Sequence, residues 1–543
     1  MDIAVAAVHE SIAAQMPSAD CIVYRERRLS WRDVSQRTRR LANYLLDHGF
    51  GCHTERHLLA PHQSGQDHLA IYLHNGNEYL EAMLGAFKAR VAPVNINYRY
   101  TATELRYLLE DSQATAIIVH SRFVPVLAEA IGPTSSVRLI LQVADESHQP
   151  LMPGAVWYED ALAAGSAEPV RATPSPDDLY ILYTGGTTGM PKGVLWRNGD
   201  ARVACFSGSE TALAPVVDQP SAARRWLTPA PFMHGSGHWA AFTSWMSGGP
   251  IIIPWRTQHL DPDDVLRTCA EERVAVLCIV GDAMARPLIT QLKTKTYRLN
   301  NLTVLVSGGA PLSFNVKAAL HELLPTVMII DGLGSSESGG HASAIRTRGS
   351  TIDGGFPLKP GAEILSADLT RVLPPTNSEV GWLAKQGRIA LGYLGDAARS
   401  AATFPTIGGV RYVVPGDRAS HRGDGTFTLY GRDSTTINSG GEKIFAEEVE
   451  AAVLRCPLVE DCVVAGRPST RWGSEVVAIV QLDPAVTSAH DQVVDEIIRI
   501  ATEHIARYKL PKQIIVVDRI ARSDVGKADY RWAARVAAHG SPR

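Results

Sequence analysis

The segment at residues 183–194 reads YTGGTTGMPKGV and directly follows an apolar run at 179–183. Its glycines let backbone N–H groups approach an anion closely, while threonine hydroxyls and a lysine add donors and positive charge. Pro191 before the lysine and Gly193 after it exclude a Walker A loop. The pattern predicts a site for nucleotide phosphates, with a mobile connecting loop as the alternative. The residues concerned are Thr184, Gly185, Gly186, Thr187, Thr188, Gly189 and Lys192.

Two more glycine-rich segments follow apolar runs that we interpret as strands. The first is SGGAPL at 307–312, and it equally suits an ordinary strand-to-helix turn. The second is DGLGSSE at 331–337; by itself it suits a helix N-terminus, with Ser336 as the cap and Glu337 favouring the helix dipole. Because α/β proteins bind ligands at the carboxyl ends of their strands, both segments are candidates for a binding site.

Three charged residues in the second half of the chain are candidates, and Asp417 and Lys527 each have a plain alternative explanation. Asp417 directly follows Gly416 and fits a surface turn. Lys527 near the C-terminus is typical of a solvated surface charge. Arg432 ends a YGR triplet, and fifteen residues separate it from Asp417. The glycines at 440 and 441 precede a helix predicted at 446–454, which is also a common arrangement.

His234 and His238 have a spacing that could chelate a metal on one face of a helix. Gly235 and Gly237 argue against a stable helix there, and no third ligand follows at a suitable spacing. We therefore do not predict a metal site at these histidines.

Taken in order, these segments resemble the motifs of the adenylate-forming enzymes, which include acyl-CoA synthetases, peptide-synthetase adenylation domains and luciferases. The resemblance runs from about residue 10 to 535 across six motifs. It implies that Lys527, Glu337, His234 and Thr184 are catalytic and that Glu337 and Thr184 bind Mg²⁺. Asp417 and Arg432 would hold the nucleotide, with Asp417 on the ribose. The other implied binding residues are Gly308, Gly309, Ala310, Pro311, Asp331, Gly332, Leu333, Gly334, Ser335, Ser336, Gly440, Gly441 and Lys443.

Three positions differ from the residues usual in that family, and one of them is Arg522, which stands where the loop before the lysine usually has Pro. Leu333 stands where an aromatic residue stacks on adenine, so adenine would meet an aliphatic wall. Ser434 stands at the interdomain hinge, which is usually Asp or Lys. Amino-acid-activating relatives carry Phe-Asp where this chain has Phe232-Met233. The resemblance therefore favours a plain carboxylic acid over an amino acid as substrate.

The implied activity is that of an ATP-dependent acyl-CoA synthetase. A carboxylate would attack the α-phosphate of ATP, and coenzyme A would then take the acyl group from the acyl-AMP. Only sixteen residues follow Lys527, too few for a fused carrier domain, so free coenzyme A is the expected acceptor. A separate acyl-carrier protein and a non-catalytic nucleotide-binding protein are the alternatives. No G-x-S-x-G occurs to support a serine hydrolase.

The substrate class is left open by the sequence. The residue pattern at 183–200 and 430–450 is most similar to that of actinobacterial fatty-acid and steroid-side-chain acyl-CoA synthetases. Medium- or long-chain, alicyclic, aryl and steroid-side-chain acids all remain candidates. Small residues at 235–237, 240 and 241 would leave a roomy apolar pocket, whereas Trp239 and Trp245 could fill it.

The pattern of elements that must position these residues predicts an α/β fold. Apolar runs at 70–74, 91–94, 116–120, 179–183, 251–254, 275–280, 303–307 and 327–331 alternate with helical patterns, as in parallel sheets. Residues 346–430 are richer in Gly, Pro and Thr and predict a β-rich part, a distorted barrel. We predict a large N-terminal domain at 1–432 and a small, mobile α+β domain at 433–543, with helices at 447–454 and 492–507 and strands at 462–466 and 476–482.

Composition agrees with a multidomain globular protein of 543 residues. The net charge of −3 gives no argument for nucleic acid, and the basic run at 37–40 is more typical of a solvated helix face. Seven scattered cysteines without C-x-x-C fit a reducing compartment. The first ten residues predict an amphipathic helix, not a signal peptide, and no run could span a bilayer. We expect a cytoplasmic protein, with a homodimer as a base-rate expectation.

Overall fold

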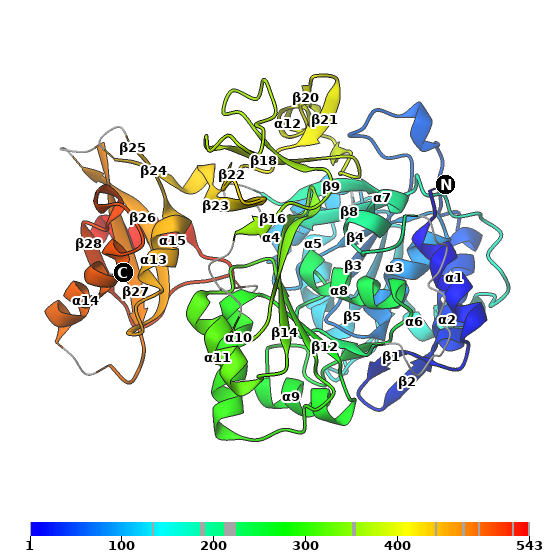
Figure 1. Cartoon of the computed structure of the whole chain (residues 1–543). Helices are drawn as coiled ribbons and strands as arrows, with labels where there is room; N and C mark the ends of the chain where they lie inside the picture. Colours follow the sequence, from blue (N-terminus) through cyan, green and yellow to red (C-terminus); the bar gives the residue numbers. More distant parts are fainter. Residues whose placement is uncertain are drawn as a thin grey trace.

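The computed structural model describes residues 2–132, 135–184, 190–210, 224–349, 355–439, 442–469, 473–486, 489–523 and 526–540. Figure 1 shows two large sheets with their helices, a third sheet beside them, and a smaller body formed by the C-terminal residues. The predicted α/β fold with largely parallel sheets is confirmed.

The first sheet has eight strands in the order β15-β14-β13-β12-β10-β11-β1-β2. Its strands are parallel from β14 to β1, and the outer strands β15 and β2 are antiparallel to their neighbours. Helices α9 (Pro262–Glu271), α10 (Gly281–Thr294) and α11 (Phe314–Leu323) share an apolar cluster with this sheet. The strands are β1 (Asp20–Tyr24), β2 (Arg27–Ser30), β10 (Trp226–Leu227), β11 (Ile251–Ile253), β12 (Val276–Ile279), β13 (Val304–Gly308), β14 (Met328–Ser335) and β15 (Gly339–Arg346).

The second sheet also has eight strands, in the order β19-β9-β8-β4-β3-β5-β6-β7. Its parallel part runs from β8 to β7, and β9 returns antiparallel to β8. The strands are β3 (His68–Tyr72), β4 (Ala92–Asn95), β5 (Ala116–His120), β6 (Leu139–Val143), β7 (Val156–Trp157), β8 (Leu179–Thr184), β9 (Lys192–Arg197) and β19 (Gly392–Tyr393).

One large apolar core joins this second sheet to the helices of the first half of the chain. Helix α3 (Asn77–Lys88) is buried along its whole length, and α8 (Gly235–Met246) packs Phe242 and Trp245 into the same core. The remaining helices of this part are α1 (Val5–Gln15), α2 (Trp31–Asp47), α4 (Ala102–Asp111), α5 (Val124–Ala130), α6 (Tyr158–Ala164) and α7 (Asn198–Ala204).

The β-rich prediction for residues 346–430 is confirmed by a third sheet. Its pairings among the described residues follow the open order β16-β23-β22-β18-β21-β20, with β17 on β18. The elements are β16 (Phe356–Pro357), β17 (Ala362–Leu365), β18 (Gly381–Gln386), α12 (Ala397–Thr403), β20 (Thr406–Ile407), β21 (Val410–Val413), β22 (Asp417–His421) and β23 (Thr426–Arg432).

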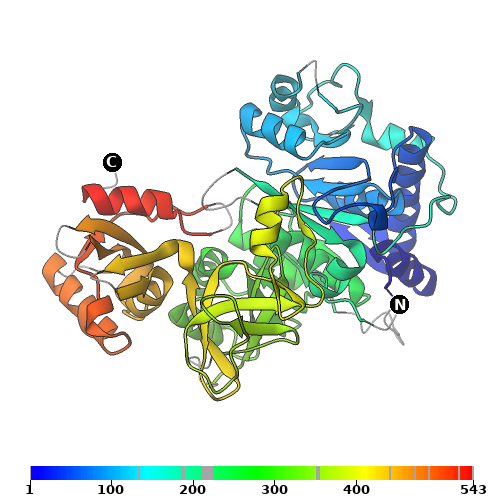
Figure 2. The ribbon, with the colours of Figure 1, turned by 90° about the horizontal axis from the view of Figure 1, so that it is seen from above.

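Residues 436–539 form what we call the C-terminal module, drawn in orange and red in Figures 1 and 2. Its five-stranded sheet has two apolar clusters of its own. Before the predicted helix, residues 436–439 and 442–445 pair as antiparallel strands. The elements are β24 (Thr436–Ser439), β25 (Glu442–Phe445), α13 (Ala446–Val453), β26 (Val459–Ser469), β27 (Gly473–Leu482), α14 (His490–Thr502), β28 (Gln513–Val516) and α15 (Tyr530–His539).

Three local predictions need correction. Helix α14 ends at Thr502 and does not reach residue 507, because a separate 3₁₀ turn occupies Arg507–Lys509. Helix α8 includes both Gly235 and Gly237, although we expected these glycines to prevent a helix. A β-carbon at 237 would lie 2.2 Å from the carbonyl oxygen of Pro231, so glycine is required there by close packing.

The basic run at 37–40 is not a freely solvated face. Arg37 pairs with Glu81 and Glu159, and Arg39 pairs with Glu10. These contacts tie α2 to α1, α3 and α6, so the arginines join helices. All seven cysteines are free. In the described part of the chain, no helix combines the length and apolarity that crossing a membrane requires.

Lys88 is a deeply buried cation of this helical region, 2% exposed. Its ammonium group donates to Glu10 and to the Thr38 hydroxyl. Burial lowers the pKa of Lys88 to about 8 although Glu10 favours the charged form. Near neutral pH the lysine is therefore charged and depends on Glu10.

We expect Glu10→Gln to lower the free energy of unfolding by about 3 kcal/mol, because it leaves a buried ammonium group without its counter-charge. Adding Lys88→Met should recover most of that loss. Urea unfolding followed by circular dichroism measures both, with Glu146→Gln as control, since the Arg25–Glu146 pair is exposed. A double variant no more stable than Glu10→Gln would contradict this role of Lys88.

Candidate active site

The predicted phosphate loop lies at one end of the second sheet. Thr184 closes β8 and stands opposite Lys192 in the antiparallel pairing with β9. The loop therefore leaves and re-enters the sheet at the same place. Residues 185–189, which include the predicted Gly185, Gly186, Thr187, Thr188 and Gly189, lie outside the described residues.

Glu337 lies in the tight turn that joins β14 to β15, not at a helix N-terminus, so the capping alternative is wrong. The backbone of this turn is held from three directions. Trp196 donates to the carbonyl of Ser336 (2.8 Å), and the Ala390 N–H donates to the carbonyl of Glu337 (3.1 Å). The buried ammonium of Lys385 donates to the carbonyls of Ser338 and Gly340, at 2.9 and 3.0 Å.

Tyr393 connects the Glu337 turn with the phosphate loop. Its hydroxyl donates to Glu337 Oε1 (2.9 Å), and the Lys192 ammonium lies 5.2 Å from the centre of its ring. That distance allows a cation–π contact. Partial burial and then the charge of Arg399 lower the pKa of Lys192, while Glu337 acts in the opposite direction. One tyrosine therefore orients both the carboxylate and the lysine.

Asp417 and Arg432 stand opposite each other at the ends of β22 and β23. Their side chains approach to 3.5 Å between Arg432 Nε and Asp417 Oδ1. Burial raises the pKa of Asp417 above its ordinary value, against the opposing effects of Arg432 and Lys527. The antiparallel pairing therefore brings together two residues that fifteen positions separate in the sequence.

Lys527 reaches the same place from the loop between β28 and α15. Protein surrounds its ammonium group although part of the side chain remains open to solvent. Desolvation and the charge of Arg432 lower the pKa of Lys527, whereas Glu337 and Asp417 raise it. The structure thus brings Lys527, Glu337, Asp417 and Arg432 together from two separate sheets and one loop.

His234 is the N-cap residue of α8. Its burial, followed by the charges of Lys527 and Arg99, lowers its pKa to about 3, so the imidazole is neutral near pH 7. His238 has its own partners: its ring bonds the carbonyl of Phe232 (2.6 Å) and the hydroxyl of Tyr180. The two histidines therefore have different surroundings, and His238 belongs to the core.

The two glycine-rich segments begin side by side, because residues 307–308 at the end of β13 pair with residues 331–332 of β14. A β-carbon at Gly309, whose φ is +85°, would lie 3.7 Å from the β-carbon of Ser236 at the start of α8. Asp331 is already paired, with its carboxylate 2.5 Å from the Lys317 ammonium. Leu333 packs against the apolar cluster of the third sheet, and its role beside adenine stays a prediction.

Three other predicted binding residues receive no side-chain description. Gly440 and Gly441 lie outside the described residues. Lys443 is placed by its backbone opposite Asn438 in the β24–β25 hairpin, and its side chain is not described. Their role as binding residues stays a prediction.

Sequence reasoning missed the residues that support this site. Tyr393, Lys385 and Trp196 hold Glu337 and its turn, and Arg399 and Arg99 add charge near Lys192 and His234. No motif surrounds them, because their contacts bridge 45 or more positions of the chain. The available signal was weak: Tyr393 lies in a short GYLG segment with glycines on both sides.

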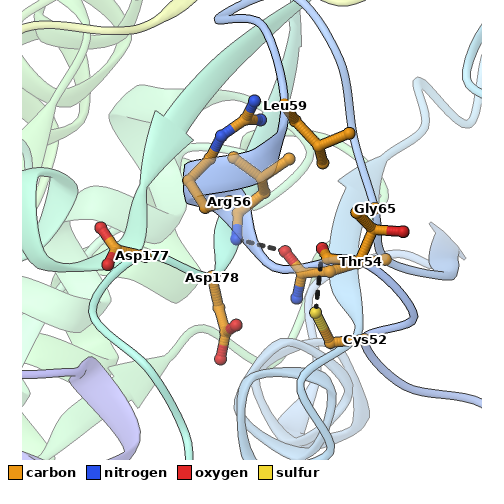
Figure 3. Close-up of a pocket in the computed structure, with 9 residues that line it drawn as sticks. Cys52, Thr54, Arg56, Leu59, Gly65, Asp177 and Asp178 are labelled. Carbon is orange, nitrogen blue, oxygen red and sulfur yellow. Dashed lines mark hydrogen bonds between the residues drawn. The ribbon is translucent and has the colours of Figure 1, made fainter.

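A small pocket lies elsewhere on the second sheet (Figure 3). It is lined by residues around the first turn of η1 (Arg56–Leu58) and by Asp177, Asp178 and Leu179 at the beginning of β8. Thr184 lies at the other end of that strand. The pocket volume of ≈ 10 Å³ has room for about one water molecule. It is separate from the site around Lys527.

Two family models cover most of the chain. The model of the AMP-binding enzyme matches residues 9–394, and the model of the AMP-binding enzyme C-terminal domain matches residues 448–527. The chain belongs to the AMP-binding enzyme family. The predicted resemblance to adenylate-forming enzymes is thereby confirmed.

Curated relatives of this AMP-binding enzyme match it over nearly the whole length. The medium-chain acyl-CoA ligase Mig of Mycobacterium avium is 48% identical, covering 99% of this chain and 98% of its own. The 3-oxocholest-4-en-26-oate–CoA ligase of Rhodococcus rhodochrous is 37% identical, covering 93% of this chain and 91% of its own.

Solved structures share the fold at low sequence identity. The anthranilate CoA ligase AuaEII in complex with anthranoyl-AMP has a TM-score of 0.82 at 20% identity, covering 99% of this chain and 98% of that one. ATP-bound MatB from Rhodopseudomonas palustris has a TM-score of 0.78 at 20% identity, covering 98% of each chain. At these identities the likeness concerns the fold alone.

We expect Tyr393→Phe to weaken ATP binding in the presence of Mg²⁺ by about tenfold, because hydrogen bonds to charged groups contribute roughly 1.5–3 kcal/mol and this one orients Glu337. Titration calorimetry with a non-hydrolysable ATP analogue measures the change. Tyr412→Phe is the matched control, since it removes another tyrosine–glutamate bond, to Glu363 (2.8 Å). Equal affinities of Tyr393→Phe and the wild type would show that Tyr393 does not support the nucleotide site.

Proposed function

We propose that this AMP-binding enzyme is an AMP-forming acid–CoA ligase. It activates a carboxylic acid as acyl-AMP with release of pyrophosphate, then transfers the acyl group to coenzyme A. The observation that carries the proposal is the convergence of Lys527 with Glu337, Asp417 and Arg432. The full-length similarity to CoA ligases supports the choice of acceptor.

The first half-reaction brings two anions together, the substrate carboxylate and the α-phosphate of ATP. A carboxylic acid with a pKa near 4 is already ionised at neutral pH, so no general base is needed. The enzyme must instead supply positive charge and fixed donors where charge develops at phosphorus. We assign that task to Lys527, with Lys192 and the Thr184–Thr188 loop on the other phosphates.

Glu337 and Thr184 are our candidates for binding Mg²⁺. Magnesium in nucleotide sites takes one or two carboxylates together with phosphate oxygens and water, so a single glutamate fits. Tyr393 already orients Oε1 of Glu337, and Oε2 would be the ligand oxygen. The metal would neutralise phosphate charge beside Lys192.

Asp417 is assigned to the ribose hydroxyls, because an ionised carboxylate accepts hydrogen bonds only. Arg432 lies 3.5 Å from it and lowers its pKa, against burial, which raises that pKa. Adenine would lie between Leu333 and the glycines of the 307–312 segment, where small residues allow close approach to the backbone.

His234 is assigned to the mouth of the acyl pocket. With its pKa at about 3 it remains neutral, so it acts as a hydrogen-bonding group and contributes no positive charge. The carboxylate of the acid would then be drawn to Lys527, whose charge already acts on His234. With His234 neutral, the positive charge of Lys527 would act at the reacting phosphate.

The acid itself is proposed to be a medium- or long-chain fatty acid or a steroid-side-chain acid. Trp245 does not fill the acyl pocket, because its ring is buried in the core and donates to the carbonyl of Cys21 (3.2 Å). Trp239 is held by the Tyr180 hydroxyl (3.0 Å). Beside α8, Ala240 meets a partly buried apolar face formed by Trp226, Val306, Met328 and Ile330.

The second half-reaction requires the thiol of coenzyme A to reach the acyl-AMP where Lys527 now lies. We place the domain boundary between 432 and 433 and propose that the small domain, 433–543, rotates about Ser434. Glu447 of α13 accepts hydrogen bonds from the Arg432 N–H (3.3 Å) and the Thr435 hydroxyl (2.9 Å). These contacts bracket Ser434 and would hold the first orientation.

The cellular compartment and the oligomeric state of the enzyme are further parts of the proposal. Seven unpaired cysteines fit a reducing compartment, so we place the enzyme in the cytoplasm. A homodimer is our expectation from base rates alone, and light scattering of the purified chain tests it.

We expect pyrophosphate release from MgATP to depend on one class of carboxylic acid, and the acyl-CoA to appear when coenzyme A is added. A panel of fatty, alicyclic, aryl and steroid-side-chain acids, each assayed with and without coenzyme A, names the substrate. Release without any thioester would point to a carrier protein as acceptor. Binding of ATP without release for any acid would overturn the proposal in favour of a non-catalytic protein.

We expect Lys527→Ala to slow acyl-AMP formation by about 10²–10³, since removal of one preorganised electrostatic contact typically costs roughly 3–4 kcal/mol. Thioester formation from supplied acyl-AMP should change far less. Single-turnover assays of each half-reaction measure the two rates. Lys509→Ala is the control, because this lysine of the same module pairs with Glu448 (2.6 Å). Equal losses in both half-reactions would refute the assignment.

A further inference from the structure

Arg522 makes the densest set of polar contacts in the loop that carries Lys527. Its guanidinium donates to both oxygens of Asp461, with Nε–Oδ2 at 2.7 Å and Nη2–Oδ1 at 2.6 Å. Its third nitrogen, Nη1, donates to the carbonyl oxygen of Gly526 at 2.9 Å. Gly526 directly precedes Lys527, so one side chain joins the lysine loop to strand β26.

This contact is strong because both partners are largely enclosed. The side chains of Arg522 and Asp461 are 23% and 17% exposed. Burial opposes the charge of Arg522, but Asp461 and the carboxylates of Glu450 and Asp282 outweigh it and raise its pKa. The guanidinium therefore stays charged, and a bidentate arginine–carboxylate pair fixes its direction as well as its position.

The loop leaves Lys527 little freedom once Gly526 is held. The Ser523 N–H donates to the carbonyl of Lys527 (2.8 Å), and the Gly526 N–H donates to the carbonyl of Ser523 (2.7 Å). Gly526 has φ of +74°, and a β-carbon there would lie 2.4 Å from the β-carbon of Ala283 on α10. The loop thus contacts the first sheet's helix layer at Gly526 and its own module through Arg522.

We propose that Arg522 is a positioning residue for Lys527 in acyl-AMP formation. This inference rests on the proposed function. Arg522 touches neither nucleotide nor acid; it acts through the Gly526 carbonyl. Asp461 precedes the buried Cys462 in β26, so the pair fastens the lysine loop to the sheet of the C-terminal module. When that module rotates, the loop and Lys527 move with it as one body.

The arrangement requires arginine in particular. A guanidinium presents several donors in a rigid fork, so it binds a carboxylate on one edge and a carbonyl with the remaining nitrogen. The lysine ammonium is a point charge on a flexible chain and would not hold both partners in fixed directions. Arg522→Lys should therefore behave more like Arg522→Met than like the wild type.

The test compares half-reactions. We expect Arg522→Met to slow single-turnover acyl-AMP formation about 30-fold, with KM for ATP within threefold and with thioester formation from supplied acyl-AMP within threefold. Asp461→Asn should show an intermediate loss in the same step. The double variant Arg522→Met with Lys527→Ala should be no slower than Lys527→Ala alone, because both changes remove the same ammonium group from the site.

The control is Arg499→Met. Arg499 is an arginine of the same module that pairs with Glu496 and Glu503 on the exposed side of α14. It should leave both half-reactions unchanged. Retained acyl-AMP formation in Arg522→Met, equal losses in both half-reactions, or additive losses with Lys527→Ala would each overturn the proposal.

A second readout does not depend on turnover and so separates this proposal from the proposed function. The pH dependence of Lys527 acetylation by acetic anhydride, followed by mass spectrometry, gives the pKa of its amine. Desolvation and Arg432 now hold that pKa below its usual value. Release of the loop in Arg522→Met should move it upward, toward the value of a solvated lysine, and Arg499→Met should not. An unchanged pKa in Arg522→Met would refute the positioning role even if no acid proves to be a substrate.

Discussion

The position of a single ammonium group, that of Lys527, is the constraint on which the rest of the structure depends. A carboxylate and a phosphate repel each other, so a reaction between them needs positive charge that is fixed before they meet. Lys527 lies among Glu337, Asp417 and Arg432, and each of these charges acts on its pKa. Glu337 and Asp417 favour its ammonium form, whereas desolvation and Arg432 lower its pKa.

The position of Lys527 relative to Glu337, Asp417 and Arg432 is defined only because these three residues are held in place by the sheets. Glu337 lies in a two-stranded turn whose carbonyls receive hydrogen bonds from Trp196 and Lys385, and its carboxylate receives one from Tyr393. Asp417 and Arg432 are set by strand pairing. Burying a lysine such as Lys385 is costly unless its donors are satisfied, and here two backbone carbonyls satisfy it. The support of the site is therefore built into the sheets.

In the proposed reaction, this rigid site must release Lys527 after the first step. The contacts across the boundary are of the kind that can be exchanged: hydrogen bonds from Glu447 around Ser434, and a close approach of Gly526 to Ala283. The contacts inside the module are firmer, since Arg522 and Asp461 form a bidentate, largely buried pair. This difference allows the module to move while its lysine loop keeps its shape.

The sequence by itself determined the fold class, the positions of most strands along the chain and the motif residues. Hydrophobic periodicity and glycine-rich turns are local properties of the chain, so they can be recognised without the tertiary structure. It also placed Lys527, Glu337, Asp417 and Arg432 on the list of candidates. Only the tertiary structure decided that they meet, that Glu337 lies in a hairpin and not at a helix start, and that Trp245 belongs to the core. It alone revealed Tyr393, Lys385 and the Arg522–Asp461 pair. Such contacts join residues 45 to 61 positions apart, and no local pattern records which side chains a sheet will bring together.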